Sequence, residues 1–150
     1  MIKRPSKYRE IEVRISRFLP PKGYFAITLF GKVFIRRHNA DFWEKNKNLQ
    51  QCKVLLHHEW IHARQAVSTH NSWICFYLLY LYYYLKNRPL RYGHRIAYYA
   101  NPFELEAYVH EKELSYAQNS ATGAYGWRDF AAMTLAKRQE MCQNIMRMRG

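Results

Sequence analysis

The chain has 150 residues, with 24 Lys and Arg against 11 Asp and Glu and a formal net charge of +13 at pH 7. Hydrophobic residues make up 49% and charged residues 23%, with only six Gly and five Pro, which excludes disordered, collagen-like and linker-dominated chains. The length predicts a single domain over residues 1–150. Three cysteines without a C-x-x-C pair argue against a disulfide framework and a cysteine zinc site. The positive charge predicts attraction to polyanions.

The N-terminal part of the chain predicts a small antiparallel sheet. Residues 11–15 alternate Ile and Val with charged side chains, which is the period-2 pattern of a half-buried strand. Two further β-rich runs, residues 24–30 and 32–36, are separated by Gly31 and are typical of a hairpin or a bulged ribbon. We therefore expect three strands before the first helix.

Helices are expected over most of the remaining chain. The predicted ranges are a short helix from Phe42, then helices at 49–68, 72–86, 101–118 and 127–148, with a loop or irregular segment at 88–99. A small sheet followed by about four helices indicates an α+β fold.

The second long helix is unusual because residues 73–85 are apolar or aromatic at every position. This run is shorter than the about 20 residues that cross a bilayer, and a helix that is apolar on all sides is usually buried, so we expect a core helix. The alternative is contact with a membrane surface or a partner through residues 73–95, because tyrosines adjoin the basic Lys86, Arg88 and Arg91. No apolar stretch follows the basic N-terminus as in a signal peptide, so the expected location is the cytoplasm or the periphery of a membrane.

The strongest chemical signal is at residues 58–62, which read H-E-W-I-H inside the predicted helix 49–68. Two histidines at positions i and i+4 project from one helical face, so His58 and His62 can reach one metal ion. Zinc accepts neutral imidazole nitrogen and prefers four ligands, one of them a water in catalytic sites. Glu59 is placed to take a proton from that water.

A third protein ligand is expected in the segment 101–108, which reads N-P-F-E-L-E-A-Y. If this segment opens a helix, Glu104 and Tyr108 share one face, while Glu106 points about 200° away and is the reserve ligand. A purely structural interpretation is also available, since Asn101 as N-cap and Glu104 at the third helical position would form a capping box. Other histidines that could serve as ligands are His57, His70, His94 and His110.

Residues 58–65 (H-E-W-I-H-A-R-Q) together with residues 101–108 resemble the gluzincin kind of zincin metallopeptidase. In that family two motif histidines and a downstream glutamate bind zinc, and the membrane peptidase branch has E-x-x-A-D where this chain has E-L-E-A-Y. The stretch 53–127 is also similar to a small uncharacterised bacterial family of predicted zincins with H-E-x-x-H-x-x-Q and N-P-x-E-x-E-A motifs. Tyr108 replaces the Asp that would orient a histidine ligand, a role left here to Gln65, a tyrosine or a backbone carbonyl.

The resemblance implies a minimal zincin-like fold, with a small sheet, the motif helix beneath it and a helical half that carries the third ligand. It also implies that an edge strand within residues 24–36 pairs with extended substrate. The predicted function is a zinc-dependent metallohydrolase, specifically a metallopeptidase that uses a zinc-activated water on a peptide or protein substrate. One Zn²⁺ is expected on His58, His62 and Glu104, with Glu59 as general base. Candidate stabilisers of the oxyanion are Tyr98, Tyr99, Tyr108 and His94.

A second hypothesis is a catalytically inactive binding protein with the same fold, whose basic surface contacts nucleic acid, an anionic membrane or an acidic protein. No helix-turn-helix, zinc-finger or RNA-binding signature is present in the sequence, so nucleic acid would be bound only non-specifically. The sequence leaves the oligomeric state open.

Overall fold

A computed structural model describes residues 12–119 and 124–149 of the chain. Its sheet contains the strands β1 (Glu12–Ser16), β2 (Ala26–Leu29) and β3 (Lys32–Arg36), in the order β1-β3-β2. β2 and β3 form an antiparallel hairpin through Phe30 and Gly31, whose φ angles of 51° and 77° are both positive. Such a turn matches the right-handed twist of the flanking strands, and the predicted hairpin is confirmed.

β1 pairs with β3 in parallel, with Val13 opposite Val33, so the sheet is mixed and the prediction of an antiparallel sheet is wrong for this strand. The chain runs along β1, returns along β2 and then enters β3 between the two strands already laid down. The chain changes direction once between β1 and β2 and again between β2 and β3, so β3 runs in the same direction as β1. The alternation of side chains predicts the buried face of a strand but carries no information on its direction.

Most of the remaining described residues lie in helices, which confirms the α+β prediction. They are α1 (Ala40–Asn46), preceded by the 3-10 turn η2 (Arg37–Asn39), then α2 (Gln50–Ser68), α3 (Trp73–Lys86), α4 (Pro89–Tyr92), α5 (His94–Tyr99), α6 (Pro102–His110), α7 (Tyr116–Asn119), α8 (Trp127–Ala132) and α9 (Leu135–Arg149). The described chain has more helices than the sequence predicts, and several of them are short.

Two of the predicted helices are divided. The helix expected over 101–118 ends at His110, and α7 follows it. The helix expected over 127–148 is interrupted at Met133, whose ψ of 154° is extended. The Thr134 hydroxyl then accepts a hydrogen bond from a backbone N–H of the first turn of α9 at 3.2 Å, which restarts the helix.

The segment 88–99, expected to be a loop, instead folds into α4 and α5. Pro89 supplies a helical φ at the first position of α4. Gly93 separates the two helices with a φ of 89°, a conformation that favours glycine.

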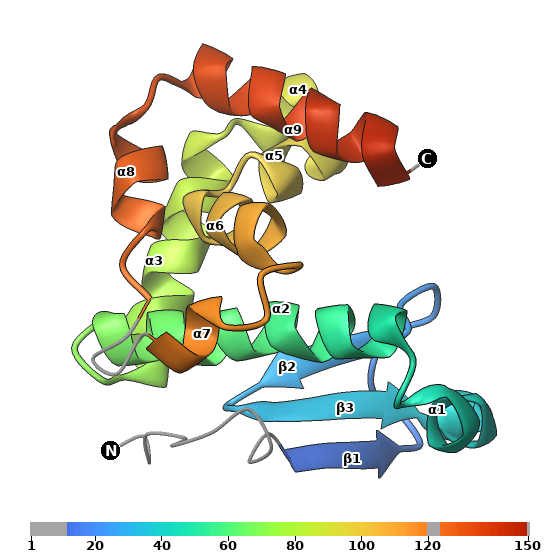
Figure 1. Cartoon of the computed structure of the whole chain (residues 1–150). Helices are drawn as coiled ribbons and strands as arrows, with labels where there is room; N and C mark the ends of the chain where they lie inside the picture. The colour runs from blue at the N-terminus through green and yellow to red at the C-terminus, as the bar shows by residue number, and fades with distance from the viewer. Residues whose placement is uncertain (1–11, 120–123, 150) are drawn as a thin grey trace.

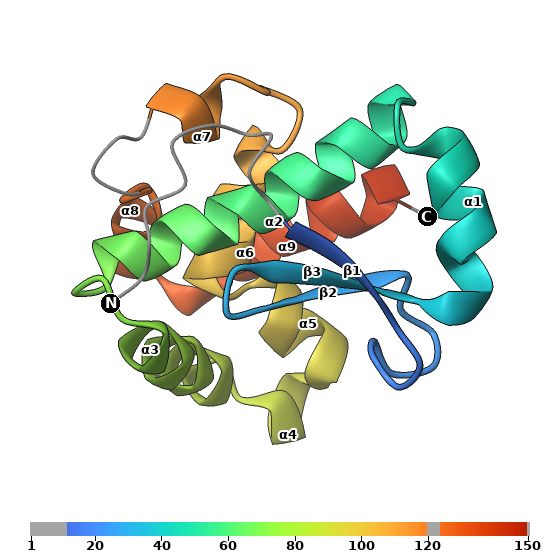
Figure 2. The same cartoon turned by 90° about the horizontal axis from the view of Figure 1, so that it is seen from below.

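α2 is the central helix, lying between the sheet and α6, while α8 and α9 pack on α6 (Figure 1). The view from below shows α1 at the end of β3 and α3 at the opposite side of the molecule (Figure 2). One apolar cluster joins the sheet to α1 and α2 through Val33, Ile35, Trp43 and Cys52. From His57 to Ser68 every residue of α2 is buried except Glu59.

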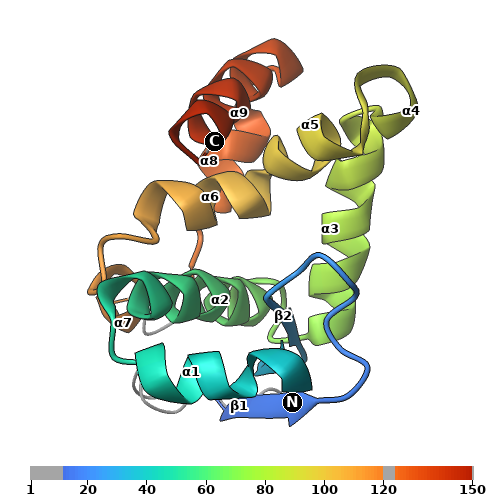
Figure 3. The same ribbon diagram turned by 90° about the vertical axis from the view of Figure 1, so that its right-hand side faces the viewer.

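α3 is not the buried core helix that its composition predicts. Phe76 is its one buried residue, because α3 stands at the side of the molecule and is covered on one face only (Figure 3). Across the described residues, no helix combines the length and the apolar character needed to span a membrane.

Candidate metal centre

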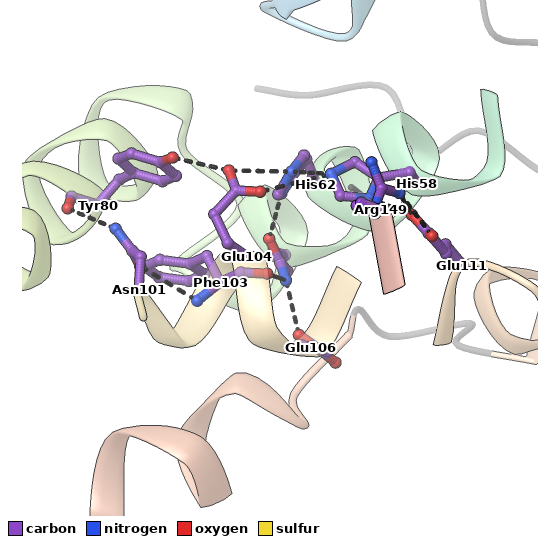
Figure 4. Close-up of polar contacts among 10 residues, drawn as sticks. His58, His62, Tyr80, Asn101, Phe103, Glu104, Glu106, Glu111 and Arg149 are labelled. Atoms are coloured by element: carbon purple, nitrogen blue, oxygen red, sulfur yellow. Dashed lines mark hydrogen bonds and ion pairs between the residues drawn. The ribbon is translucent and has the colours of Figure 1, made fainter. Parts of the chain in front are cut away.

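His58 and His62 come from consecutive turns of α2 and point to the same side (Figure 4). Both rings are buried, and their Nε2 atoms lie 3.2 Å apart. This proximity follows from the i, i+4 spacing that the sequence predicts.

Glu104 is brought to the same place by the start of α6. Asn101 caps this helix, its side chain accepting a hydrogen bond from the Phe103 N–H at 3.2 Å, and Asn101 Nδ2 donates to the Tyr80 carbonyl of α3 at 3.1 Å. The Asn101 N–H donates to the Tyr98 carbonyl, so the Glu104 carboxylate is not used in a capping box. It accepts instead a hydrogen bond from the Tyr80 hydroxyl at 2.7 Å and faces the two histidines.

The three side chains offer ligand atoms that all lie within 4.8 Å of one another, which is the spacing of a site for a metal ion. Glu104 Oε2 lies 3.5 Å from His58 Nε2, and Glu104 Oε1 lies 3.5 Å from His62 Nε2. Four ligands placed tetrahedrally about 2.0–2.1 Å from a zinc ion are about 3.3–3.4 Å apart, so these separations fit that ion. Glu104 Oε2 is buried and receives no hydrogen bond within the part of the chain that the structure describes.

The outer nitrogen of His58 is held by a carboxylate. His58 Nδ1 lies 3.0 Å from Glu111 Oε2, and the Arg149 guanidinium donates to both oxygens of Glu111 at 2.6 and 2.7 Å. A carboxylate accepts, so Nδ1 carries the proton and Nε2 presents its lone pair to the centre.

The outer nitrogen of His62 is held by an amide. Gln65 donates through Nε2 to the Phe103 carbonyl at 2.9 Å and to Glu106 Oε2 at 2.8 Å, which turns its Oε1 to His62 Nδ1 at 2.8 Å. His62 therefore donates from Nδ1 and also presents a lone pair at Nε2. Two lone pairs that face each other at 3.2 Å repel unless a cation or a proton lies between them.

The charges of the centre favour a cation. Burial opposes protonation of His58, but the carboxylates of Glu104 and Glu111 outweigh it and raise its pKa to about 10. Burial likewise opposes protonation of His62, and Glu104 raises its pKa above the ordinary value. The pKa of Glu104 stays far below its ordinary value despite burial, because both imidazoles stabilise the carboxylate. A negative, desolvated carboxylate between two imidazoles is a suitable environment for a divalent ion.

Glu106, the reserve ligand, has its oxygens engaged away from the centre. Besides the bond from Gln65, its Oε1 accepts hydrogen bonds from the Tyr116 hydroxyl at 2.6 Å and from the Gly126 N–H at 2.8 Å. Its place in this geometry is to hold Gln65, which in turn holds His62.

The remaining histidines considered as ligands lie elsewhere. His57 contacts the Glu111 carbonyl and the Ala117 N–H, His94 contacts Tyr84, His110 contacts Glu113, and His70 follows the end of α2.

A cavity of about 490 Å³ borders the centre between β2, α3 and α5. Glu59, His62 and Glu104 line it together with the whole of β2 and five aromatic residues of α3, namely Trp73, Phe76, Tyr77, Tyr80 and Tyr84. Of the candidate oxyanion stabilisers, Tyr98 and His94 line this cavity, whereas Tyr99 and Tyr108 are not among its lining residues.

Glu111 and Arg149 are the residues that sequence reasoning missed. Glu111 follows Glu104 by seven residues, which places both on nearly the same helical face, so a search for acids in phase with Glu104 could have found it. Arg149 lies at the end of α9 and carries no local signal.

The chain matches no family model, and neither a curated protein nor a solved structure is significantly similar to it.

Proposed function

We propose that the chain is a zinc-dependent metallohydrolase, specifically a metallopeptidase. The observation that carries the proposal is the meeting of His58, His62 and Glu104 beside a cavity that Glu59 also lines. His58, His62 and Glu104 would hold one Zn²⁺, which supplies a Lewis acid and an activated water. The resemblance to gluzincins supports the same ligand set.

Glu59 has the position of a general base. It is adjacent to a ligand, and it is the one residue from His57 to Ser68 that is not buried. Its carboxylate can take a proton from water in the cavity and deliver it to the leaving amine.

Tyr98 supplies a donor for the negative charge that develops on the attacked carbonyl oxygen. Burial and the neighbouring Glu104 carboxylate raise the pKa of Tyr98, so its phenol keeps its proton and can donate a hydrogen bond. His94, held by the Tyr84 hydroxyl at 2.8 Å, is the second candidate on the cavity wall.

β2 supplies a surface for an extended substrate. It is at one edge of the three-stranded sheet of the described chain, and Ala26, Ile27, Thr28 and Leu29 all line the cavity. A peptide that added to this edge as a further strand would lie beside the candidate metal centre.

The first test is the metal content of the purified protein, measured by elemental analysis. We expect about one zinc per chain in the wild type and a loss of zinc in Glu104→Gln. Glu106→Gln is expected to bind zinc more weakly but still to retain it, because Glu106 holds Gln65 and does not face the metal. Absence of zinc after reconstitution, or loss of zinc in Glu106→Gln alone, would contradict the ligand set.

The second test separates metal binding from turnover. With a fluorescence-quenched peptide library as probe, Glu59→Gln is expected to keep its zinc and to lose hydrolysis by at least about 100-fold. Zinc in the wild type without cleavage of any library peptide would support the binding protein rather than the peptidase.

A further inference from the structure

One face of α3 exposes large apolar side chains. Ile74, Leu78, Leu81, Tyr82 and Leu85 are 69%, 63%, 51%, 53% and 58% exposed. At about 100° per residue these five positions fall within an arc of about 100°, the width of the apolar stripe of an amphipathic helix. We refer to these five residues as the α3 stripe. Leu90 of α4, which follows the end of α3, is also fully exposed.

The opposite face of α3 is fixed against the body of the protein. Phe76 is buried, and its ring packs on Phe103 at a centroid distance of 5.0 Å. Tyr83 packs on Phe103 and Trp127, and Tyr80 donates its hydrogen bond to Glu104. The outward orientation of the α3 stripe is therefore set by contacts of the inner face, and a contiguous exposed apolar surface of this kind is characteristic of an interaction site.

The charges beside the α3 stripe have one sign. Lys86, Arg88, Arg91 and Arg95, which we call the basic cluster, are all exposed and follow the stripe along the chain. The sequence contains no acidic residue between Glu59 and Glu104. Figure 3 shows α3 as one side of the molecule with α4 at its end, so the elements that carry the stripe and the cluster are neighbours.

We propose that the α3 stripe and the basic cluster form a docking site for an anionic lipid surface. An apolar stripe beside an all-basic segment is complementary to a bilayer that has an acyl interior and anionic headgroups. A second copy of this chain fits less well, because the same segment offers no acid to pair with the cations. Leu81 belongs both to the stripe and to the cavity lining, so a docked lipid surface would adjoin the cavity.

The test is flotation of the full chain with vesicles of phosphatidylcholine alone or of phosphatidylcholine mixed with phosphatidylserine. We expect binding to the anionic vesicles that falls with added salt. Leu78→Gln/Leu85→Gln is expected to weaken it by at least about tenfold, and Lys86→Gln/Arg91→Gln/Arg95→Gln by about fivefold per cation removed. The readout does not depend on zinc, so its failure leaves the proposed hydrolase untouched.

Matched controls separate this surface from the general positive charge. Met148→Gln changes an apolar residue of α9 that is 77% exposed, and Lys45→Gln/Lys112→Gln/Arg147→Gln removes the same charge from exposed residues elsewhere. Both controls are expected to bind as the wild type does. Equal losses in the two triple variants would overturn the proposal, as would absence of binding to anionic vesicles at low salt. A concentration-dependent dimer that Leu78→Gln/Leu85→Gln abolishes would identify a second copy as the occupant instead.

Discussion

Gln65 offers the sharpest test of how the candidate metal centre is built. Its side chain is fully buried and joins three groups: His62 Nδ1 at 2.8 Å, the Phe103 carbonyl at 2.9 Å and Glu106 Oε2 at 2.8 Å. Gln65→Leu keeps the approximate shape of the side chain and removes all three hydrogen bonds. The variant lacks the Gln65 Oε1 atom that accepts a hydrogen bond from His62 Nδ1, so neither the orientation of the His62 ring nor the position of its proton is fixed by this residue.

The expected cost has two parts. A buried polar group left without its partner costs about 1–3 kcal/mol, and Glu106 keeps its bonds from Tyr116 and Gly126, so the free energy of unfolding should fall by about 2–5 kcal/mol. Loss of a group that orients a metal-ligating histidine weakens metal binding by about 10–100-fold. That range corresponds to about 1.4–2.8 kcal/mol of binding free energy.

The assay is competition for zinc against a chelating dye, at a temperature where circular dichroism shows the variant to be folded. Gln51→Leu is the control, because it makes the same change at an exposed position of the same helix. A zinc affinity of folded Gln65→Leu equal to that of the wild type would refute the reasoning, as would an equal loss in Gln51→Leu.

Three further predictions concern the surroundings of the centre. A Cβ at Gly126 would lie 2.8 Å from Glu106 Oε1, so Gly126→Ala should lower the free energy of unfolding by about 1–3 kcal/mol, and an unchanged denaturation midpoint would contradict this contact. Glu111→Gln should weaken zinc binding by about tenfold in calorimetry, since the carboxylate orients His58, and full affinity would limit Glu111 to a structural role. When a chelator keeps the protein free of metal, protonated His58 stabilises the folded state, because its pKa is raised from 6.5 to about 10. This contribution to the free energy of unfolding is fully present below pH 6.5 and is lost as the pH rises towards about 10. The melting temperature of metal-free protein should therefore fall across that range, and a constant melting temperature would count against the buried ion pair.

Sequence reasoning succeeded where one helix determines the geometry. The i, i+4 spacing places His58 and His62 on one face whatever else surrounds them. The phase of α6 follows from its cap at Asn101, and that phase separates Glu104 from Glu106. The breaks that divide the later helices were missed, because an extended residue such as Met133 carries no Pro or Gly signal.

Features that depend on contacts between elements were beyond reach. The parallel pairing of β1 depends on where β3 enters the sheet, which side-chain alternation does not record. The composition of α3 predicts burial, yet its exposure depends on how much of the chain is left to cover it. The inner face of α3 packs on the body of the protein, and its outer face stays exposed.

Contacts between elements also decide between Glu104 and Glu106, the two glutamates that the sequence offers as a third ligand. Both Glu104 and Glu106 are buried and both accept hydrogen bonds, so burial alone does not separate them. Glu106 receives donors from Gln65, Tyr116 and Gly126. Glu104 Oε2, in contrast, makes no hydrogen bond among the described residues and lies 3.5 Å from His58 Nε2. A fully satisfied carboxylate supports structure, and a buried carboxylate with an unsatisfied oxygen favours a nearby cation, either a metal ion or a protonated imidazole. Hydrogen-bond donors from other elements therefore distinguish Glu104, which would hold zinc, from Glu106, which holds Gln65 in place. The spacing of residues in the sequence does not reveal these donors.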